Sequence, residues 1–365
     1  MNRASAAIAA AVALLFSMGL LMVFNTTSAE ILDRALNEDT HWALYKQMGY
    51  GVAGLGFALL AMHLGYEFFI RWSTPLLIGV TLLLVLVFVP GIGQTLNGAR
   101  RWLGLFGVTF QPSECLKIIF PAYYIYWINK NRDLSLRSFL VLLGWLLIPL
   151  GLVLLEPDNG TTAILLALLV ALFFLSQVRW RYWALPLLVV AGLGLGAASQ
   201  MPHVMTRLRV FLHPEADLLG KGHQPHQAKI AAGSGRLLGR GLGESVQKLN
   251  YLPEARSDYI AAIYAEETGF IGILFLILLY MGISCSGFWI ALQARDSMGY
   301  FFAATITFLI ALESFLNLGV VSGLLPSKGM TLPFFSQGGS SLVVHLVAVG
   351  LLLDISRKGA RSCVF

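Results

Sequence analysis

The sequence predicts an all-α fold: a polytopic integral membrane protein with ten transmembrane helices. Hydrophobic residues make up 57% of the 365 residues and charged residues only 12%, and the mean hydropathy of +0.74 is too high for a soluble domain. Apolar stretches recur along the chain at about 18 residues or more, the length that crosses about 30 Å of hydrocarbon. The sequence lacks the repeated alternation of short strands that a membrane β-barrel would need.

Each expected span is a mostly apolar run bounded by polar or turn-forming residues. A cleaved signal peptide is the alternative for the first, but its apolar core exceeds the roughly 7–15 residues of such a segment, which favours a retained helix. We expect one membrane domain over residues 1–365, with a large outer loop at about 200–258 between spans seven and eight. The spans lie at about Ala6–Asn25, Leu44–Glu67, Thr74–Pro90, Phe110–Ile128, Ser138–Leu155, Thr161–Val178, Ala184–Gln200, Ile260–Leu292, Phe301–Gly323 and Ser340–Ile355.

The distribution of lysine and arginine predicts the orientation. With ten spans, most cations of the short loops and termini fall on one side, which the positive-inside rule assigns to the cytoplasm together with both termini. The long loop is then outside, yet it also carries many cations, from Arg207 to Arg256. This charge suits a phosphate-bearing lipid or an acidic polymer, and a solvated loop without a ligand is the alternative.

Several classes of site find no support in the sequence. Three scattered cysteines provide neither a disulfide framework nor metal-ligand spacing. The glycine-rich stretch Gly233–Gly243 follows no strand and lacks the Gly-Lys-Ser/Thr ending of a nucleotide loop. Pro225 separates His223 from His226, so a zinc site is not favoured. We expect no nucleotide and no nucleic-acid partner, so that an activated group must arrive on the substrate.

Polar residues gather in four clusters, all on the predicted outer side. In the first, "NGARRWLGLFGVTFQPSECLK", Pro112 suits a first helical turn, and Glu114 and Lys117 are three residues apart on one helix face. Ionisable groups at membrane depth are costly. The pair therefore either lines a polar cavity or forms a structural ion pair that fixes helix packing.

The second and third clusters are turns between spans. "EPDNGTT", Glu156 to Thr162, places two acids two residues apart, either to contact a metal or hydroxyl or to be solvated. In Ser322–Ser341, prolines and glycines interrupt membrane-like sequence around a single charge, Lys328. Irregular backbone at this depth is tolerated where it lines a cavity or is buried. A re-entrant turn is the simpler interpretation.

The fourth cluster, Tyr251–Gly269, crosses from the outer loop into the eighth span. Asp258 lies at the start of that helix. It is either an N-cap or a carboxylate at the water–lipid boundary that accepts a proton from a substrate hydroxyl. Glu266 and Glu267 lie two turns deeper, and at least one must face protein or a cavity, because a carboxylate exposed to lipid is costly.

At these clusters the sequence resembles the SEDS family of shape, elongation, division and sporulation proteins, which includes RodA, FtsW and SpoVE. The resemblance covers nearly the whole chain, and two segments look more like the division branch, "SVQKLNYLPEA" and "GLLPSKG". His223, Ala261 and Gln337 depart from the family's usual residues without removing a charged group. The matching segments, in the family's order, are "NGARRW", "QPSECLK", "EPDNGT", "GLGESVQKLNYLPEARSDYIAAIYAEETGFIG" and "NLGVVSGLLPSKGMTLPFFSQGGSS".

The resemblance implies a peptidoglycan glycosyltransferase of the bacterial cytoplasmic membrane. Such an enzyme polymerises lipid II, a disaccharide-pentapeptide on undecaprenyl diphosphate, into β-1,4 glycan at the outer face during septal wall synthesis. The implied partners are a class B penicillin-binding protein and the divisome, and a divalent cation, Mg²⁺ or Mn²⁺, is a further expectation. Asp258 matches the family's essential aspartate and is the expected general base. The expected substrate-binding residues are Arg100, Arg101, Glu114, Lys117, Lys248, Lys328, Ser336 and Ser340.

Three other functions remain open. A lipid II flippase would also place charges inside a helical bundle, although its polar groups should follow the whole depth of the membrane and not crowd the outer side. A scaffold for the transpeptidase would not need Asp258. An elongation-type polymerase would share the chemistry and differ only in its place in the cell.

Overall fold

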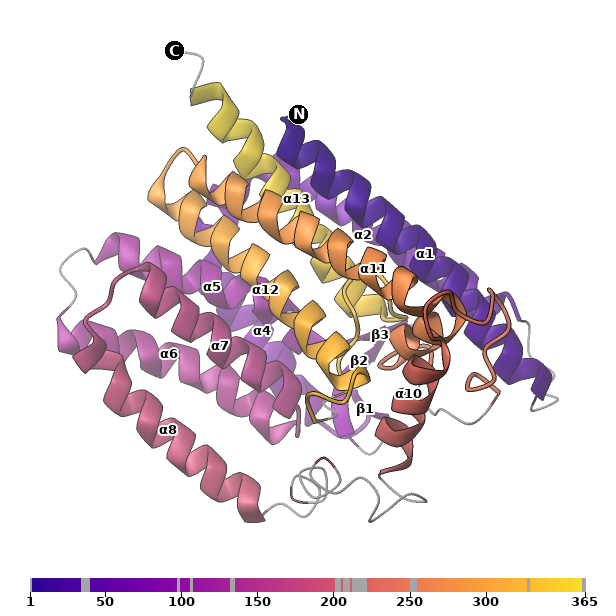
Figure 1. Cartoon of the computed structure of the whole chain (residues 1–365). Helices are drawn as coiled ribbons and strands as arrows, with labels where there is room; N and C mark the ends of the chain where they lie inside the picture. Colours follow the sequence, from indigo (N-terminus) through magenta and orange to yellow (C-terminus); the bar gives the residue numbers. More distant parts are fainter. Residues whose placement is uncertain are drawn as a thin grey trace.

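The computed structural model describes residues 2–33, 40–96, 99–105, 108–131, 135–200, 205, 211, 222–249, 255–326 and 329–362. Over these residues the chain is mostly helical, as predicted, with one small sheet (Figure 1). The helices are α1 (Arg3–Asp33), α2 (Trp42–Leu64), α3 (Tyr66–Arg71), α4 (Ser73–Val87), α5 (Pro112–Lys130), α6 (Leu136–Leu155), α7 (Asn159–Leu175), α8 (Trp180–Gln200), α10 (His223–Ser234), α11 (Ile260–Leu292), α12 (Ser297–Val321) and α13 (Gly339–Ser362).

Each predicted span falls on helix, with shifted ends. The second span is divided at Gly65, whose φ of 84° suits glycine and separates α2 from α3. Within the described residues, α1, α2, α6, α11, α12 and α13 are long and apolar enough to cross a membrane, and α4 and α7 are shorter apolar helices. These helices indicate a multi-pass membrane protein, while the count of ten spans stays a prediction.

The helices pack so that both ends of the chain meet. Helix α13 packs along α2, α11 packs along α12 and α1, and α5 connects this group to α4 and α7. The start of α1 and the end of α13 lie together at one end of the molecule, where Ser5 Oγ is 2.8 Å from Ser356 Oγ. The sheet and α10 lie at the opposite end (Figure 1).

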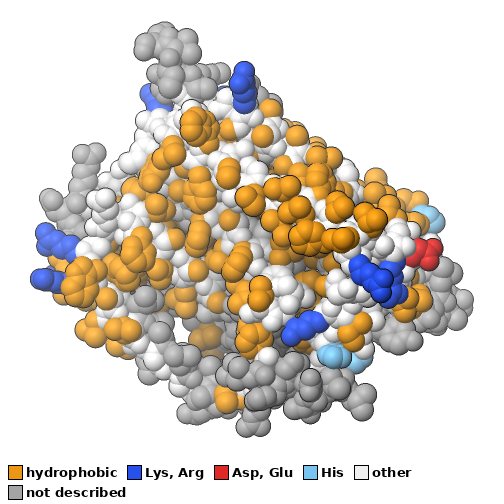
Figure 2. Space-filling model, in the orientation of Figure 1, with side chains coloured by type: hydrophobic (Ala, Val, Ile, Leu, Met, Phe, Trp, Pro, Cys, Tyr) orange, Lys and Arg blue, Asp and Glu red, His pale blue; other side chains and the backbone are white. Residues whose placement is uncertain are grey.

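The outer surface of the helices is apolar, as a lipid environment requires. Large side chains such as Leu82, Phe270 and Leu278 are exposed on α4 and α11. In the face shown in Figure 2, apolar side chains cover the middle, and Lys and Arg lie towards its ends and edges. Backbone polar groups are satisfied inside each helix, which allows these faces to contact hydrocarbon.

A small three-stranded sheet, which the sequence analysis did not predict, is added to the predicted helices. Strand β1 (Gly93–Leu96) pairs antiparallel with β2 (Ala99–Leu105), which pairs antiparallel with β3 (Val108–Phe110). Leu96 pairs with Ala99, and the two residues between them in the sequence are Asn-Gly, the dipeptide most typical of a short hairpin turn. The Asn-Gly dipeptide by itself predicts a hairpin, but the long apolar spans on either side favour an all-helical interpretation.

Helix α11 is kinked at Gly269, where φ is 68° and ψ is −164°. The segment 236–241 of the outer loop fills the kink. The amides of Arg240 and Gly241 donate to the carbonyl oxygens of Glu266 and Glu267, and the amide of Phe270 donates to the Arg236 carbonyl. This pairing fixes the first two turns of α11, which follow Asp258, against the outer loop.

Candidate functional site

A cavity of about 510 Å³ lies at the end of the molecule that holds the sheet and α10. Its volume falls within the roughly 300–1,000 Å³ that is usual for small-molecule sites. All four polar clusters of the sequence contribute to its wall. The charged lining residues are Arg101, Glu114, Lys117, Asp158, Asp258 and Glu313, and neutral polar ones include Thr109, Gln111, Thr161, Gln224, Thr331, Gln337, Ser340 and Ser341.

Asp258 is half-buried on the cavity wall. Tyr259 occupies the N-cap position of α11, and Asp258 lies one residue before it. Asn317 of α12 donates from Nδ2 to the Asp258 carbonyl at 3.0 Å and to the Met330 carbonyl at 2.7 Å. Asn317 thereby connects the backbone of Asp258 to the segment between α12 and α13.

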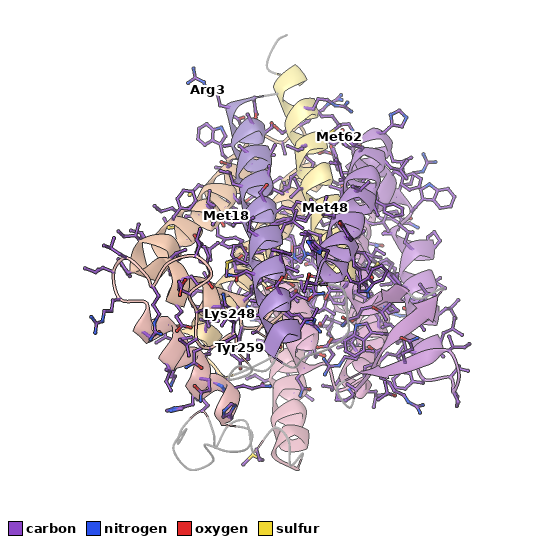
Figure 3. All side chains as sticks on the ribbon, turned by 90° about the vertical axis from the view of Figure 1, so that its right-hand side faces the viewer. Arg3, Met18, Met48, Met62, Lys248 and Tyr259 are labelled. Atoms are coloured by element: carbon purple, nitrogen blue, oxygen red, sulfur yellow. The ribbon has the colours of Figure 1, made fainter. Side chains whose placement is uncertain are left out.

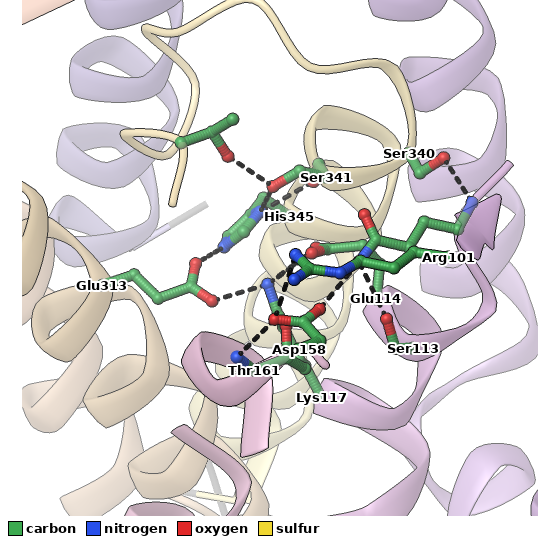
Figure 4. A network of polar contacts seen from close by, with 12 residues as sticks. Arg101, Ser113, Glu114, Lys117, Asp158, Thr161, Glu313, Ser340, Ser341 and His345 are labelled. Atoms are coloured by element: carbon green, nitrogen blue, oxygen red, sulfur yellow. Dashed lines mark hydrogen bonds and ion pairs between the residues drawn. The ribbon is translucent and has the colours of Figure 1, made fainter. Parts of the chain in front are cut away.

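Lys117 is the centre of a buried ion cluster on the same wall (Figure 4). Its Nζ lies 2.7 Å from both oxygens of Glu114, on the same helix, and 2.7 Å from Glu313 Oε1 on α12. All three side chains are at least nine-tenths buried. The spacing of Glu114 and Lys117 thus predicted their ion pair, and the pair both lines the cavity and joins two helices.

Sequence reasoning missed Glu313 and His345. Glu313 Oε2 lies 2.6 Å from His345 Nε2 of α13, and His345 is fully buried. A signal was available, because Glu313 is the only charged residue between Phe301 and Gly323. An ionisable residue inside a membrane span is a candidate functional residue by default.

Arg101 and Asp158 form a second charged group at the cavity. The guanidinium lies 3.6 Å from Asp158 Oδ1, and it also donates to the carbonyl oxygens of Glu156 and Pro157 at 3.1 and 2.5 Å. Asp158 caps α7 by accepting from the Thr161 amide at 3.1 Å, and it accepts from Gln111 Nε2 at 3.0 Å. Neither acid of this turn is solvated, contrary to one of the two sequence interpretations.

Glu156 is 1% exposed in the turn after α6, and its two carboxyl oxygens have no hydrogen-bond partner among the described residues. Burial raises the pKa of Glu156 to about 8, and the charge of Asp158 raises it further against the opposing effect of Arg101. Glu156 is therefore mostly protonated at neutral pH, because burial without a hydrogen-bond partner outweighs the opposing effect of Arg101.

We expect Glu156→Gln to change the pH dependence of stability. A folded-state pKa above the unfolded value of 4.5 means that the wild type loses stability as pH rises from about 4.5 to about 8, by a few kcal/mol in all. Glutamine mimics the protonated acid and removes that loss. Thermal unfolding at pH 5 and pH 9 should show equal midpoints at the lower pH and a higher midpoint for the variant at the higher pH. The exposed Glu244→Gln is the control, and a pH-independent difference would contradict the assignment.

Three expected substrate-binding residues lie outside the lining of the cavity. Arg100 is exposed and donates to Thr95 Oγ1, and Ser336 is buried and accepts from the Leu332 amide. Lys248 is buried beside Glu267, with Nζ 3.1 Å from its carboxylate, and it points into the protein near the start of α11 (Figure 3). Lys328 lies outside the described residues.

Glu266 and Glu267 are both buried, which confirms that the acids at the start of α11 avoid lipid. Glu267 accepts from Asn25 Nδ2 of α1 at 2.7 Å and pairs with Lys248, while Glu266 accepts from Ser245 Oγ at 2.6 Å. Through these contacts the two acids of α11 hold the outer loop against α11, and Glu267 also connects α11 to α1. Lys248 therefore belongs to a structural cluster in this structure.

The described residues do not fit a resident metal site. No group of three or more His, Cys, Asp or Glu side chains in the described part of the chain is placed to hold an ion. Of the cavity carboxylates, Glu114 and Glu313 are bound to Lys117, and Asp158 is bound to Arg101, Thr161 and Gln111. Any ion at this cavity would take most of its ligands from a bound molecule or water.

A family model described as cell cycle protein, covering FtsW, RodA and SpoVE, matches residues 5–361. The chain belongs to this FtsW, RodA and SpoVE family. The resemblance found in the sequence motifs is thereby confirmed over almost the entire chain.

Curated relatives of the family align over most of their length. A protein of Trichlorobacter lovleyi named probable peptidoglycan glycosyltransferase FtsW is 39% identical over 352 residues, which are 94% of this chain and 90% of the relative. A protein of Legionella pneumophila with the same name is 38% identical, with 94% and 88% coverage. Stage V sporulation protein E of Bacillus subtilis is 36% identical, with 94% coverage of each.

Solved structures of the family share the fold. A chain from a peptidoglycan synthase complex, in work on the coordination of polymerization and crosslinking, has a TM-score of 0.75 and 27% identity, with 96% of this chain and 97% of that chain covered. Thermus thermophilus RodA, a rod shape determining protein, has a TM-score of 0.70 and 25% identity, with 96% of each covered. The arrangement of helices in this chain is thus that of the FtsW, RodA and SpoVE family.

Proposed function

We propose that this chain is a peptidoglycan glycosyltransferase that polymerises lipid II at the outer face of the cytoplasmic membrane. The activity is the one in the names of its FtsW relatives. The observation that carries the proposal is the position of Asp258 on the wall of a polar cavity, at the end of the molecule opposite both termini. With the termini in the cytoplasm, as the positive-inside rule predicts, that end faces outward.

In the proposed reaction Asp258 is the general base. Its carboxylate accepts the proton of an acceptor sugar hydroxyl as the oxygen forms a bond to the anomeric carbon of the donor. The bond between that carbon and the diphosphate oxygen breaks, and the diphosphate leaves with the electron pair. Because one displacement occurs at the carbon, an α-linked donor gives a β-1,4 glycan.

The rest of the cavity orients the two substrates. Asn317 and Gln337 hold the backbone at Asp258 and just before it, since Asn317 Nδ2 donates to the Asp258 carbonyl and the backbone amide of Gln337 donates to the Arg256 carbonyl, both at 3.0 Å. Arg101 and Lys117 are the described cations of the lining, and they would face the developing charge on the diphosphate. A divalent cation bound to the diphosphate would supply further positive charge to the leaving group.

The biological setting is part of the proposal. Motif segments of the division type and FtsW-named relatives support a role in septal wall synthesis, and the family's elongation branch is the alternative. The similar chain from a peptidoglycan synthase complex supports a partner that crosslinks the glycan, of the class B penicillin-binding type. We place the chain in the bacterial cytoplasmic membrane with both termini inside, alongside divisome proteins.

The experiment that tests the function gives purified full-length chain fluorescent lipid II, with and without its transpeptidase partner. We expect glycan ladders on a denaturing gel, and EDTA with added Mg²⁺ or Mn²⁺ reports whether an ion is needed. If no ladder forms under any condition while labelled lipid crosses the bilayer of proteoliposomes, the chain is a flippase. If neither occurs and the chain only binds its partner, it is a scaffold.

A further inference from the structure

Glu313 on the cavity wall and His345 behind it form a buried pair. One oxygen of Glu313 contacts Lys117 Nζ at 2.7 Å and the other contacts His345 Nε2 at 2.6 Å. Figure 4 shows this chain of contacts running from Lys117 through Glu313 to His345. His345 is fully buried and does not line the cavity, so it acts on a bound molecule only through its neighbours.

Both ring nitrogens of His345 face oxygen atoms that serve as acceptors. Nδ1 lies 2.7 Å from the Ser341 carbonyl oxygen, and Nε2 faces the Glu313 carboxyl group. A carbonyl has no hydrogen, so Nδ1 carries one, and the contact at Nε2 requires a second hydrogen on the ring or on Glu313. The pair therefore has zero net charge, whichever of the two atoms carries the second proton.

The charge of the whole cluster follows from that proton. Glu114 and Lys117 cancel each other, so the four groups sum to zero when the pair is protonated. Without the second proton the cluster carries one net negative charge, and three of its members line the cavity. A buried negative charge weakens the binding of an anion at such a wall, because little solvent lies between them.

We propose that His345 is a positioning residue that keeps the charge of the Lys117 wall neutral, so that the cavity can bind a diphosphate group. The inference rests on the proposed function, in which the diphosphate belongs to the lipid-linked donor. With the proton present, Glu313 is shared between Lys117 and His345. With the proton lost, the carboxylates of Glu114 and Glu313 are both balanced by Lys117 alone. Its ammonium then attracts the diphosphate less strongly.

Among the described residues near His345, no second cation could balance the charge of Glu313 if this proton were lost. The charged groups that act most strongly on the ring are Glu313 from α12 and Lys117 and Glu114 from α5. Ser341 Oγ of its own helix lies 3.3 Å from Nδ1, and the Phe334 ring packs edge-on with its centroid 5.7 Å away. Lys117 is the nearby cation, and it is already held by two carboxylates.

The test measures the affinity of the full-length chain for inorganic pyrophosphate by calorimetry. His345→Gln removes the second proton while leaving an amide that can donate to the Ser341 carbonyl. We expect it to weaken pyrophosphate binding on the order of tenfold at neutral pH. Because pyrophosphate itself becomes more charged as pH rises, the wild type and the variant are compared at each pH, and the affinity advantage of the wild type should shrink as pH rises. In polymerisation assays the variant should raise KM for lipid II more than it lowers kcat.

The double variant Glu313→Gln/His345→Gln separates charge from packing. It returns the cluster to zero net charge, and the two amides can still connect Lys117 to the Ser341 carbonyl. We expect it to recover most of the lost affinity, and His63→Gln, an exposed histidine of α2, to change nothing. Wild-type affinity in His345→Gln, or a double variant no better than the single one, overturns the proposal. The predicted affinity pattern in a chain that makes no glycan supports the charge role and rejects the polymerase function.

Discussion

Asp258→Asn is expected to lower the initial rate of glycan formation by about 100-fold or more, the usual contribution of a general base. Asparagine keeps the size of the side chain and can still hydrogen-bond, but it cannot accept a proton from the acceptor hydroxyl. The side chain is half-buried at the end of the helix bundle, and the protein holds its backbone through Asn317. We therefore expect folding and lipid II binding to be retained.

The measurement compares glycan ladders from wild type and variant at equal amounts of folded protein, judged by gel filtration and thermal midpoint. Asp296→Asn is the matched control, since Asp296 caps α12 at Gly299 and lies outside the cavity lining. Asparagine is also a good N-cap, so the control should keep its activity. Ladders of wild-type intensity from Asp258→Asn would remove Asp258 from the role of base.

Lys117→Met is expected to destabilise the fold by about 3–5 kcal/mol, the usual effect of breaking a buried ion pair from one side. Lys117 is 4% exposed and is held by Glu114 and Glu313, which would remain buried without their cation. Methionine has a similar shape, so the loss reports charge more than packing. We expect a clearly lower thermal midpoint and no polymerisation.

Two further variants serve as controls for Lys117→Met. Lys46→Met, an exposed lysine of α2, should unfold like the wild type. Adding Glu114→Gln and Glu313→Gln to Lys117→Met should restore much of the stability, because neutral groups replace the uncompensated carboxylates. An unchanged midpoint in Lys117→Met would show that the ion cluster does not stabilise the packing of α5 on α12.

The sequence predicts the positions of the apolar helices well, because each helix needs only its own composition. It also predicts that Arg101, Glu114, Lys117, Asp258 and Ser340 share a site, and the structure brings all five to the lining of one cavity. These residues stand out because charge and irregular backbone are costly at membrane depth and therefore mark a polar interior.

The remaining features depend on how the helices are rotated against one another. Nothing in the sequence around Glu313 or His345 reveals that α12 and α13 turn these side chains towards each other, or that Lys117 lies next to them. Lys248 has the charge of a phosphate-binding residue, but the kink at Gly269 brings the outer loop back so that this lysine meets Glu267. These contacts depend on tertiary packing, which cannot be predicted from the composition of each segment alone.

The most direct test asks whether the cavity at Asp258 faces outward. The Asp258→Cys variant is treated in spheroplasts with a membrane-impermeant maleimide. Cys115, Cys285 and Cys363 are replaced by serine in this chain, so that the new thiol alone reacts. We expect labelling from outside without permeabilisation, and slower labelling when lipid II or pyrophosphate fills the cavity. Labelling that requires access from the cytoplasm, or that neither ligand slows, would contradict this expectation.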